Sequence, residues 1–85
     1  MELYKYFPKT KDELIENIEE LISKDIYDLN TIDVSKITDM SDLFENIELK
    51  SQLDVSKWNV SNNTNMFSMF NNCTSLKNTP NWYKE

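Results

Sequence analysis

The most constraining feature of this sequence is a phrase that occurs twice at a fixed offset. Segment 34–46 reads VSKITDMSDLFEN and segment 60–72 reads VSNNTNMFSMFNN, so the two share Val, Ser, Thr, Met, Phe and Asn in register. We call the offset from Val34 to Val60 the repeat period. A period of roughly 20 to 50 residues is typical of units that cannot bury their own apolar faces and must stack on a neighbour. The repeat therefore predicts that each copy forms part of the other copy's core.

Each copy carries a short alternating pattern followed by a helical spacing. Ile32 and Val34 in the first copy, and Trp58 and Val60 in the second, alternate with polar neighbours as in a strand. Either Thr38 or Asp39, and either Thr64 or Asn65, is placed to cap a short helix. The apolar residues that follow would share one helical face; they are Met40, Leu43, Phe44 and Ile47 in the first copy and Met66, Met69, Phe70 and Cys73 in the second.

The segment before the repeats predicts a helix over residues 11–24. Thr10 and Glu13 have the spacing of a capping box. The apolar residues that follow recur with a helical period and would form one stripe; they are Leu14, Ile15, Ile18, Leu21 and Ile22. We therefore expect a single α/β domain, a short leucine-rich-repeat-like solenoid of about two strand-helix units with an N-terminal capping helix. Its parts would be the capping helix region 1–28, repeat unit one over 29–54, and repeat unit two with a terminal cap over 55–85, where Trp82 and Tyr83 would close the end.

Charge is distributed unevenly along the 85 residues, whose net charge is −6. Residues 1–48 contain thirteen acids and five lysines, whereas residues 49–85 contain two acids and four lysines. An acidic half repels nucleic acid and anionic membranes, so a charged target would be a basic protein surface. The alternative is that the acids only keep a small protein soluble.

The residue types exclude most catalytic chemistry. The chain has no His, Arg or Gly, so it lacks the usual general base, the bidentate phosphate clamp and any glycine-rich phosphate loop. Its single cysteine, Cys73, has no histidine partner for nucleophilic catalysis and lies on an apolar face, which indicates an inert core thiol. We expect no enzyme, no cofactor and no metal site.

The phrases IDVSKITDMSDLFEN and WNVSNNTNMFSMFNNCTSL resemble the 26-residue repeats of BspA-like bacterial surface proteins. The entry segment TKDELIENIEELI, followed by DLNTIDVSKITDMSDLF, is similar to the leading segment of such arrays, and the resemblance covers about residues 8–82. It implies a leucine-rich-repeat-type scaffold and a binding or adhesion role. The chain differs from the pattern in having two units and in carrying Ile47 where the second unit has Cys73.

Two features could form a contact surface for a partner. The first is the acidic half, with Glu13, Glu16 and Glu20 on the predicted helix and Asp39, Asp42 and Glu45 in unit one. The second is Phe67, which replaces Ser41 of unit one and would lie off the apolar helical face, where an exposed aromatic can be a binding hot spot. The alternative for Phe67 is packing under the tail near Trp82. We expect the N-terminal aromatics Tyr4, Tyr6 and Phe7 to pack on the helix.

The leading hypothesis is an intracellular inhibitor or adaptor that occupies a basic surface of a larger partner, for example a phage-encoded anti-defence or anti-CRISPR-type inhibitor of a nucleic-acid-handling protein. The alternative is a fragment of a secreted adhesin that binds host proteins, and a third hypothesis is a homo-oligomer with a scaffold role. No secretion signal or apolar run of roughly 20 residues is visible. We therefore expect a cytoplasmic protein that contacts no membrane and no nucleic acid directly, or a cell-surface one if the chain is a fragment.

Overall fold

Helix α1, Lys11–Ser23, is the regular element of the computed structural model, which describes residues 4–47, 52–61, 64–73, 76 and 79–83. The predicted cap is confirmed. The Thr10 hydroxyl accepts a hydrogen bond from the Glu13 N–H at 3.2 Å, and the Glu13 carboxylate accepts one from the Lys9 N–H at 2.7 Å. Two main-chain donors near the helix start, where intrahelical partners are missing, are satisfied in this way.

The end of α1 is fixed by Asp25, which has a φ of 60°. Its N–H donates to the Ile22 carbonyl at 2.9 Å, and the N–H of Ile26 donates to the Leu21 carbonyl at 2.9 Å. This pair of bonds is a Schellman motif, in which the left-handed position is normally occupied by glycine. The chain has no glycine, so an aspartate occupies it here.

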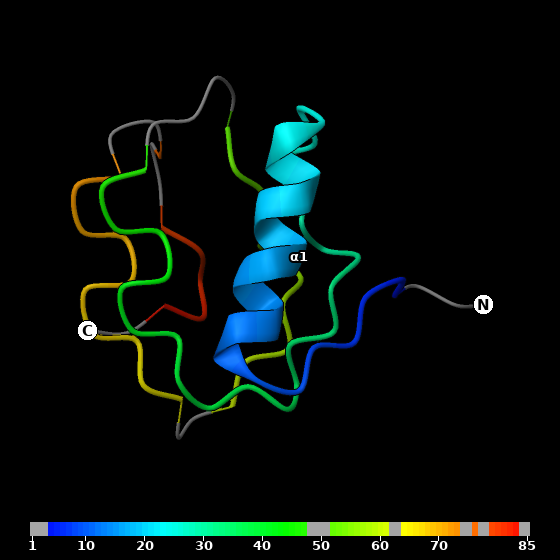
Figure 1. The fold of residues 1–85 in the computed structure, drawn as a ribbon. Coiled ribbons are helices and arrows are strands. Elements are labelled where there is room, and N and C mark those ends of the chain that lie inside the picture. The colour runs from blue at the N-terminus through cyan, green and yellow to red at the C-terminus, as the bar shows by residue number, and fades with distance from the viewer. Residues whose placement is uncertain (1–3, 48–51, 62–63, 74–75, 77–78, 84–85) are drawn as a thin grey trace.

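The apolar stripe of α1 faces the rest of the molecule. Leu14, Ile18 and Leu21 are buried and belong to one continuous cluster of buried side chains that also includes residues from both repeat copies. In Figure 1, α1 stands beside the winding segments formed by the repeats. The helix therefore covers apolar surface that the two copies leave open.

The predicted fold class, an α/β solenoid of strand-helix units, is wrong. Over the described residues the repeats form no sheet and no helix; they form consecutive turns joined by isolated parallel bridges. The described part of the chain is a small globule with one helix rather than a solenoid of strand-helix units. The repeat does appear in the bridges, because each joins residues one repeat period apart: Tyr6 with Ile32, Asp28 with Asp54, and Asp39 with Asn65.

The predicted short helices fail because main-chain donors of copy one bond to copy two. The N–H of Phe44 donates to the Met69 carbonyl at 2.8 Å. In an α-helix the same N–H would donate to the carbonyl of the fourth residue before it. Positive φ at Asp42 and Asn46, which recurs one repeat period later at Ser68 and Asn72, also breaks any helix.

Asx turns replace the predicted helix caps. Asp39 and Asn65 do accept main-chain N–H bonds with their side chains, but from Ser41 and Phe67, two residues on, so each closes a turn. The same arrangement recurs along the chain. The side chains of Asp28, Asp33 and Asp54 accept the N–H groups of Asn30, Ser35 and Ser56.

Aromatic side chains join the layers of the core. Phe44 stacks on its repeat equivalent Phe70 with ring centroids 5.4 Å apart, and Trp58 stacks on Trp82 at 6.0 Å. The indole N–H of Trp82 donates to the Val55 carbonyl at 2.9 Å. As predicted, Trp82 packs against the end of the second copy, and Tyr83 meets Phe70 edge-on at 4.9 Å.

Candidate functional site

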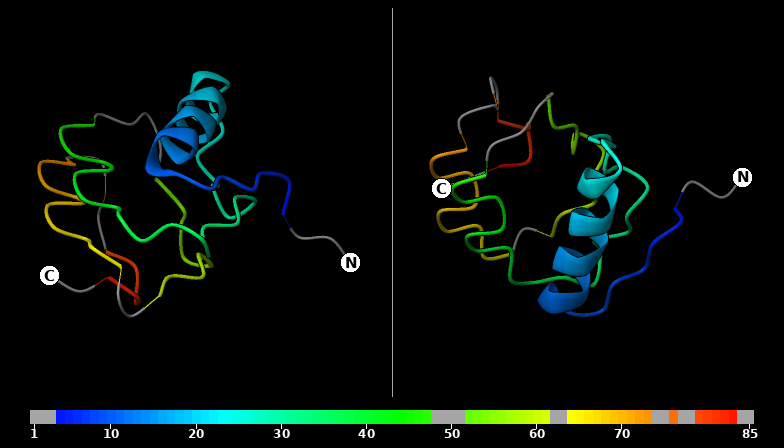
Figure 2. Two further views of the ribbon diagram at one scale, coloured as in Figure 1. Left: turned by 60° about the horizontal axis from the view of Figure 1, so that its bottom comes forward. Right: turned by 45° about the horizontal axis from the view of Figure 1, so that its top comes forward.

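Two stacked turn segments, 38–47 of copy one and 64–73 of copy two, form the surface that carries most of the predicted contact residues. Figure 2 shows them lying side by side along one flank of the molecule in both views. Main-chain bonds connect them: the N–H of Asp42 donates to the Phe67 carbonyl at 3.0 Å, and the N–H of Asn65 donates to the Thr38 carbonyl at 2.8 Å. Side chains on the outer side of these turns are therefore held on a fixed main chain.

Phe67 projects from this surface with 74% of its area exposed. Its neighbours Met66 and Met69 are buried, and its own N–H is held by the Asn65 side chain at 3.1 Å. The structure rules out the alternative in which Phe67 packs under the tail. Its exposure was predicted from a helical direction, whereas the actual cause is its position in a turn.

Three carboxylates lie on the copy-one turn next to Phe67. Asp39 accepts hydrogen bonds from the Ser41 hydroxyl at 2.6 Å and the Ser41 N–H at 3.0 Å, and Lys11 of α1 approaches it at 3.8 Å. The two Ser41 bonds and the Lys11 charge hold the pKa of Asp39 below its usual value, so it is ionised at neutral pH. Asp42 is exposed, and Glu45 accepts from the Asn71 amide at 3.2 Å.

The helix acids lie elsewhere. Glu13, Glu16 and Glu20 face the N-terminal segment: the Glu20 carboxylate accepts from the Tyr6 hydroxyl at 3.3 Å and pairs with Lys24 at 3.7 Å. Glu13 and Glu16 border a shallow groove of about 300 Å³. On α1 these acids are roughly opposite Lys11, the residue that reaches the copy-one turn. The structure therefore divides the seven predicted contact residues into two groups rather than one surface.

Phe7 is an exposed aromatic, contrary to the prediction that it packs on the helix. It lines the groove beside Glu13 and Glu16 with 57% of its area exposed, whereas Tyr6 next to it packs against the buried cluster as predicted. No local signal in the sequence separates these two adjacent aromatics. Phe7 supplies an internal comparison for Phe67, because both are exposed phenylalanines close to carboxylates.

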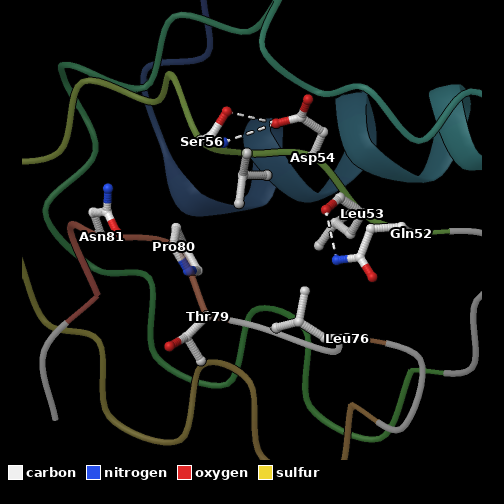
Figure 3. A pocket seen from close by; sticks show the side chains of 9 residues that line it. Gln52, Leu53, Asp54, Ser56, Leu76, Thr79, Pro80 and Asn81 are labelled. Atoms are coloured by element: carbon white, nitrogen blue, oxygen red, sulfur yellow. Dashed lines mark hydrogen bonds between the residues drawn. The ribbon is translucent and has the colours of Figure 1, made fainter.

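A second groove, of about 470 Å³, opens between segment 52–56 and the tail (Figure 3). Its wall includes Asp54 and Ser56, which hydrogen-bond to each other, and Pro80 and Asn81 from the tail. Of the nine lining residues, Asp54 is the ionisable one. The hydrogen bonds between Asp54 and Ser56 serve the local turn.

Cys73 is buried in the apolar cluster, in agreement with a core thiol. Burial raises the pKa of its thiol, which keeps it protonated and poorly nucleophilic at neutral pH. Across the described ranges, no three His, Cys, Asp or Glu side chains gather as metal ligands. No helix among the described residues is long and apolar enough to cross a membrane.

Comparison with known proteins gives a match to one family model and no match to an individual protein or solved structure. No curated protein and no solved structure shows significant similarity to the chain. Residues 9–84 match the model of a family described as "Mycoplasma protein of unknown function, DUF285". That match spans nearly the whole chain, including α1 and both repeat copies, so this chain is a member of the DUF285 family.

Proposed function

We propose that this chain is a non-enzymatic protein-binding module that occupies a basic surface of a larger protein. The observation that carries the proposal is the position of Phe67. Its ring is 74% exposed on a turn whose main chain is bonded to the turn bearing Asp39, Asp42 and Glu45. An exposed aromatic on a rigid support, with carboxylates beside it, suits a partner that presents an apolar pocket bordered by Lys or Arg.

The two kinds of residue would contribute differently to binding. Phe67 would supply affinity, because burying an aromatic ring removes a large apolar area from water and the rigid turn limits the entropy lost on binding. The carboxylates would mainly raise the association rate and select basic partners, since exposed charges act over a distance that salt screens. The helix acids Glu13, Glu16 and Glu20 are a separate group and would act through the general field of the molecule.

The test is capture of partners from the source cell's lysate with matched variants. Phe67→Ser restores the residue that copy one has at this position and should abolish retention of the partner without unfolding the protein. Phe7→Ser removes the other exposed phenylalanine and should leave retention unchanged. Equal loss of the partner with both variants, or with neither, would contradict the proposal.

The proposed role of the carboxylates in the association rate is tested by salt and by charge reversal. Asp42→Lys changes an exposed side chain with no hydrogen bond of its own among the described residues. It should slow association several-fold at low salt and have little effect at high salt. An association rate that responds to neither salt nor Asp42→Lys would restrict the role of the acids to solubility.

Two versions of this function differ in compartment. One is an intracellular inhibitor or adaptor, supported by the excess of acids in residues 1–48. The other is a piece of a surface adhesin, supported by the resemblance of its repeats to those of BspA-like proteins. Antibody labelling of intact and permeabilised source cells separates them: labelling of intact cells favours the adhesin, and labelling only after permeabilisation favours the inhibitor.

A further inference from the structure

The parallel bridge between Asp28 and Asp54 joins copy one to copy two through one donor and one acceptor on each side. The N–H of Asp54 donates to the Tyr27 carbonyl at 2.9 Å, and the carbonyl of Asp54 accepts the N–H of Leu29 at 2.9 Å. The residues before and after Asp28 thus supply the pair of main-chain groups on which the next segment is added.

The same pair of positions recurs one repeat period later, where the groove of about 470 Å³ opens. Leu53 is the equivalent of Tyr27 and Val55 is the equivalent of Leu29, and both line the groove. In Figure 3 their wall, segment 52–56, faces the tail across the groove. The groove therefore lies along the edge of copy two on which a further segment could be added.

Main-chain groups of Leu53 and Val55 point to this edge. In an extended segment, groups of successive residues point to opposite edges, so these point away from copy one, to which Asp54 is bonded. The Val55 carbonyl agrees, because it accepts the indole N–H of Trp82 of the tail at 2.9 Å. Over the described residues, the Val55 N–H donates to no protein acceptor, and the Leu53 carbonyl accepts only the adjacent Gln52 side-chain amide, at 3.3 Å.

The described part of the tail does not form the corresponding bridge. Pro80 lies one repeat period after Asp54, and proline has no N–H to donate to the Leu53 carbonyl. The Pro80 carbonyl accepts the N–H of Tyr83 at 3.0 Å instead. A donor and an acceptor with the spacing of a parallel bridge therefore remain open, and such an edge is a template for pairing with another chain.

We propose that this groove binds an extended segment of another protein, which adds to the edge of copy two as the next parallel strand. The central residue of that segment would donate its N–H to the Leu53 carbonyl and accept the N–H of Val55. Addition of a strand to an open edge is a recurring mode of peptide recognition, in which main-chain bonds supply affinity and side-chain contacts supply specificity.

The apolar side chains around the groove define the residues on either side of the central one. The side chains of Leu53 and Val55 are buried, and Leu76 is half-buried against the apolar cluster where it lines the groove. Residues in register on adjacent strands share a face of the sheet. The two residues that flank the central residue would therefore be apolar.

The charge of Asp54 defines the central residue itself. Asp54 is exposed between the two buried side chains, and hydrogen bonds, the largest from the side-chain amide of Asn30, hold its pKa below the usual value. It is therefore negatively charged at neutral pH, and no described lysine forms an ion pair with it. A central lysine or arginine complements this charge, so the expected segment reads apolar, basic, apolar.

This groove is distinct from the surface of the proposed function. None of Phe67, Asp39, Asp42 and Glu45 lines it. Binding of an extended segment in the groove and binding of a partner at Phe67 can therefore succeed or fail separately.

The test is an NMR titration of the isotope-labelled full chain with the peptide acetyl-Thr-Val-Lys-Val-Thr-amide. We expect a saturable shift of the Val55 N–H and several-fold slower exchange of this group with solvent, because exchange requires the new bond to open. Absence of a saturable shift at Val55 up to the solubility limit of the peptide would overturn the inference. A Val55 shift that grows with protein concentration without peptide would also overturn it, because a second copy would then occupy the edge.

Matched peptides and variants test each contact. N-methylation of the central lysine removes the donor for the Leu53 carbonyl and should abolish binding; unchanged binding would overturn the proposal. Replacing that lysine by glutamine should weaken binding by about twofold to fivefold, and Asp54→Asn should remove the difference between the two peptides. Phe67→Ser should bind the lysine peptide as the unaltered chain does, which separates this inference from the proposed function.

Discussion

At the scale of single residues, the chain has no glycine, so residues with a side chain occupy the positions where the main chain is left-handed. Among the described residues, positive φ occurs at Asp25, Asp42, Asn46, Ser68 and Asn72. Asn and Asp tolerate this region better than other residues with a side chain, but serine has no such advantage. Ser68 is therefore the position where the left-handed turn has the highest local cost.

Replacing Ser68 by glycine should raise the free energy of unfolding by about 0.5 kcal/mol, because the relief of left-handed strain exceeds the added entropy of the unfolded chain. Ser68→Val should lower it by about 1–2 kcal/mol, since a branched side chain fits this region worst. Urea denaturation measures both. Lys36→Gly, at an exposed site without positive φ, is the control and should destabilise.

Asp54 illustrates a residue whose charge supports a turn. The side-chain amide of Asn30, followed by the hydroxyl and the N–H of Ser56, holds the pKa of Asp54 below its usual value. A carboxyl group whose pKa is lowered by folding contributes stability above its unfolded pKa and loses that contribution as pH falls through its folded pKa. The contribution is thus present at neutral pH and disappears below about pH 4.

Asp54→Asn should consequently flatten the acid side of the stability curve. The variant keeps a side-chain oxygen for the Ser56 N–H, as Asn65 does for the Phe67 N–H in an Asx turn of the same kind, but it has no charge to lose. The difference in urea midpoint between neutral pH and pH values below about 4 should shrink. Ser56→Ala should shrink it in the same direction by removing the hydroxyl donor. An unchanged difference in both variants would show that Asp54 does not govern acid sensitivity.

At the scale of elements, α1 depends on a cap that lies on its exposed side. Thr10→Ala removes the acceptor for the Glu13 N–H and should lower the free energy of unfolding by about 1 kcal/mol. Urea denaturation followed by the helical circular dichroism signal measures this loss. Thr38→Ala is the matched control, because its exposed hydroxyl caps no helix. Equal effects of the two substitutions would argue against a capping contribution.

The elements also show which predictions a sequence of this kind supports. Helix α1 was predictable because its cap, its apolar period and its length all agree, and every donor in its interior is satisfied within the helix itself. The turns of the repeats were not predictable, because Met40, Leu43 and Phe44 have a spacing that a helix and a run of four-residue turns share. The difference lies in where the N–H groups go, here to the other copy, and that depends on contacts one repeat period away.

The candidate site also has one feature that the sequence predicts and one that it does not. Exposure of Phe67 followed from its being the residue that differs between otherwise equivalent positions, and it is confirmed. The grouping of the acids was not predictable, because it depends on how α1 is rotated against the repeats, with Lys11 towards Ser41 and Glu20 towards Tyr6. Such a rotation is set by tertiary packing and leaves no local signal in the sequence.

At the scale of the whole molecule, a single buried cluster connects α1, both copies and the tail. Leu14 of α1 is fully buried in the same cluster as Phe44 and Trp58. Many main-chain bonds outside α1 join segments one repeat period apart, so no copy closes its own core. Repeat proteins can unfold unit by unit when units contact only their neighbours, but shared burial of this kind favours one cooperative transition.

We therefore expect the helix and the repeats to unfold together in urea. Circular dichroism of α1 and fluorescence of the stacked Trp58 and Trp82 should give the same midpoint. Leu14→Ala should lower stability by about 2–5 kcal/mol through loss of burial and the cavity left behind, and should move both midpoints equally. If the variant moved only the helical signal, α1 would be a separate unit resting on an independently stable pair of repeats. Equal movement would instead show that the repeats need α1 to bury the apolar surface that two copies cannot cover alone.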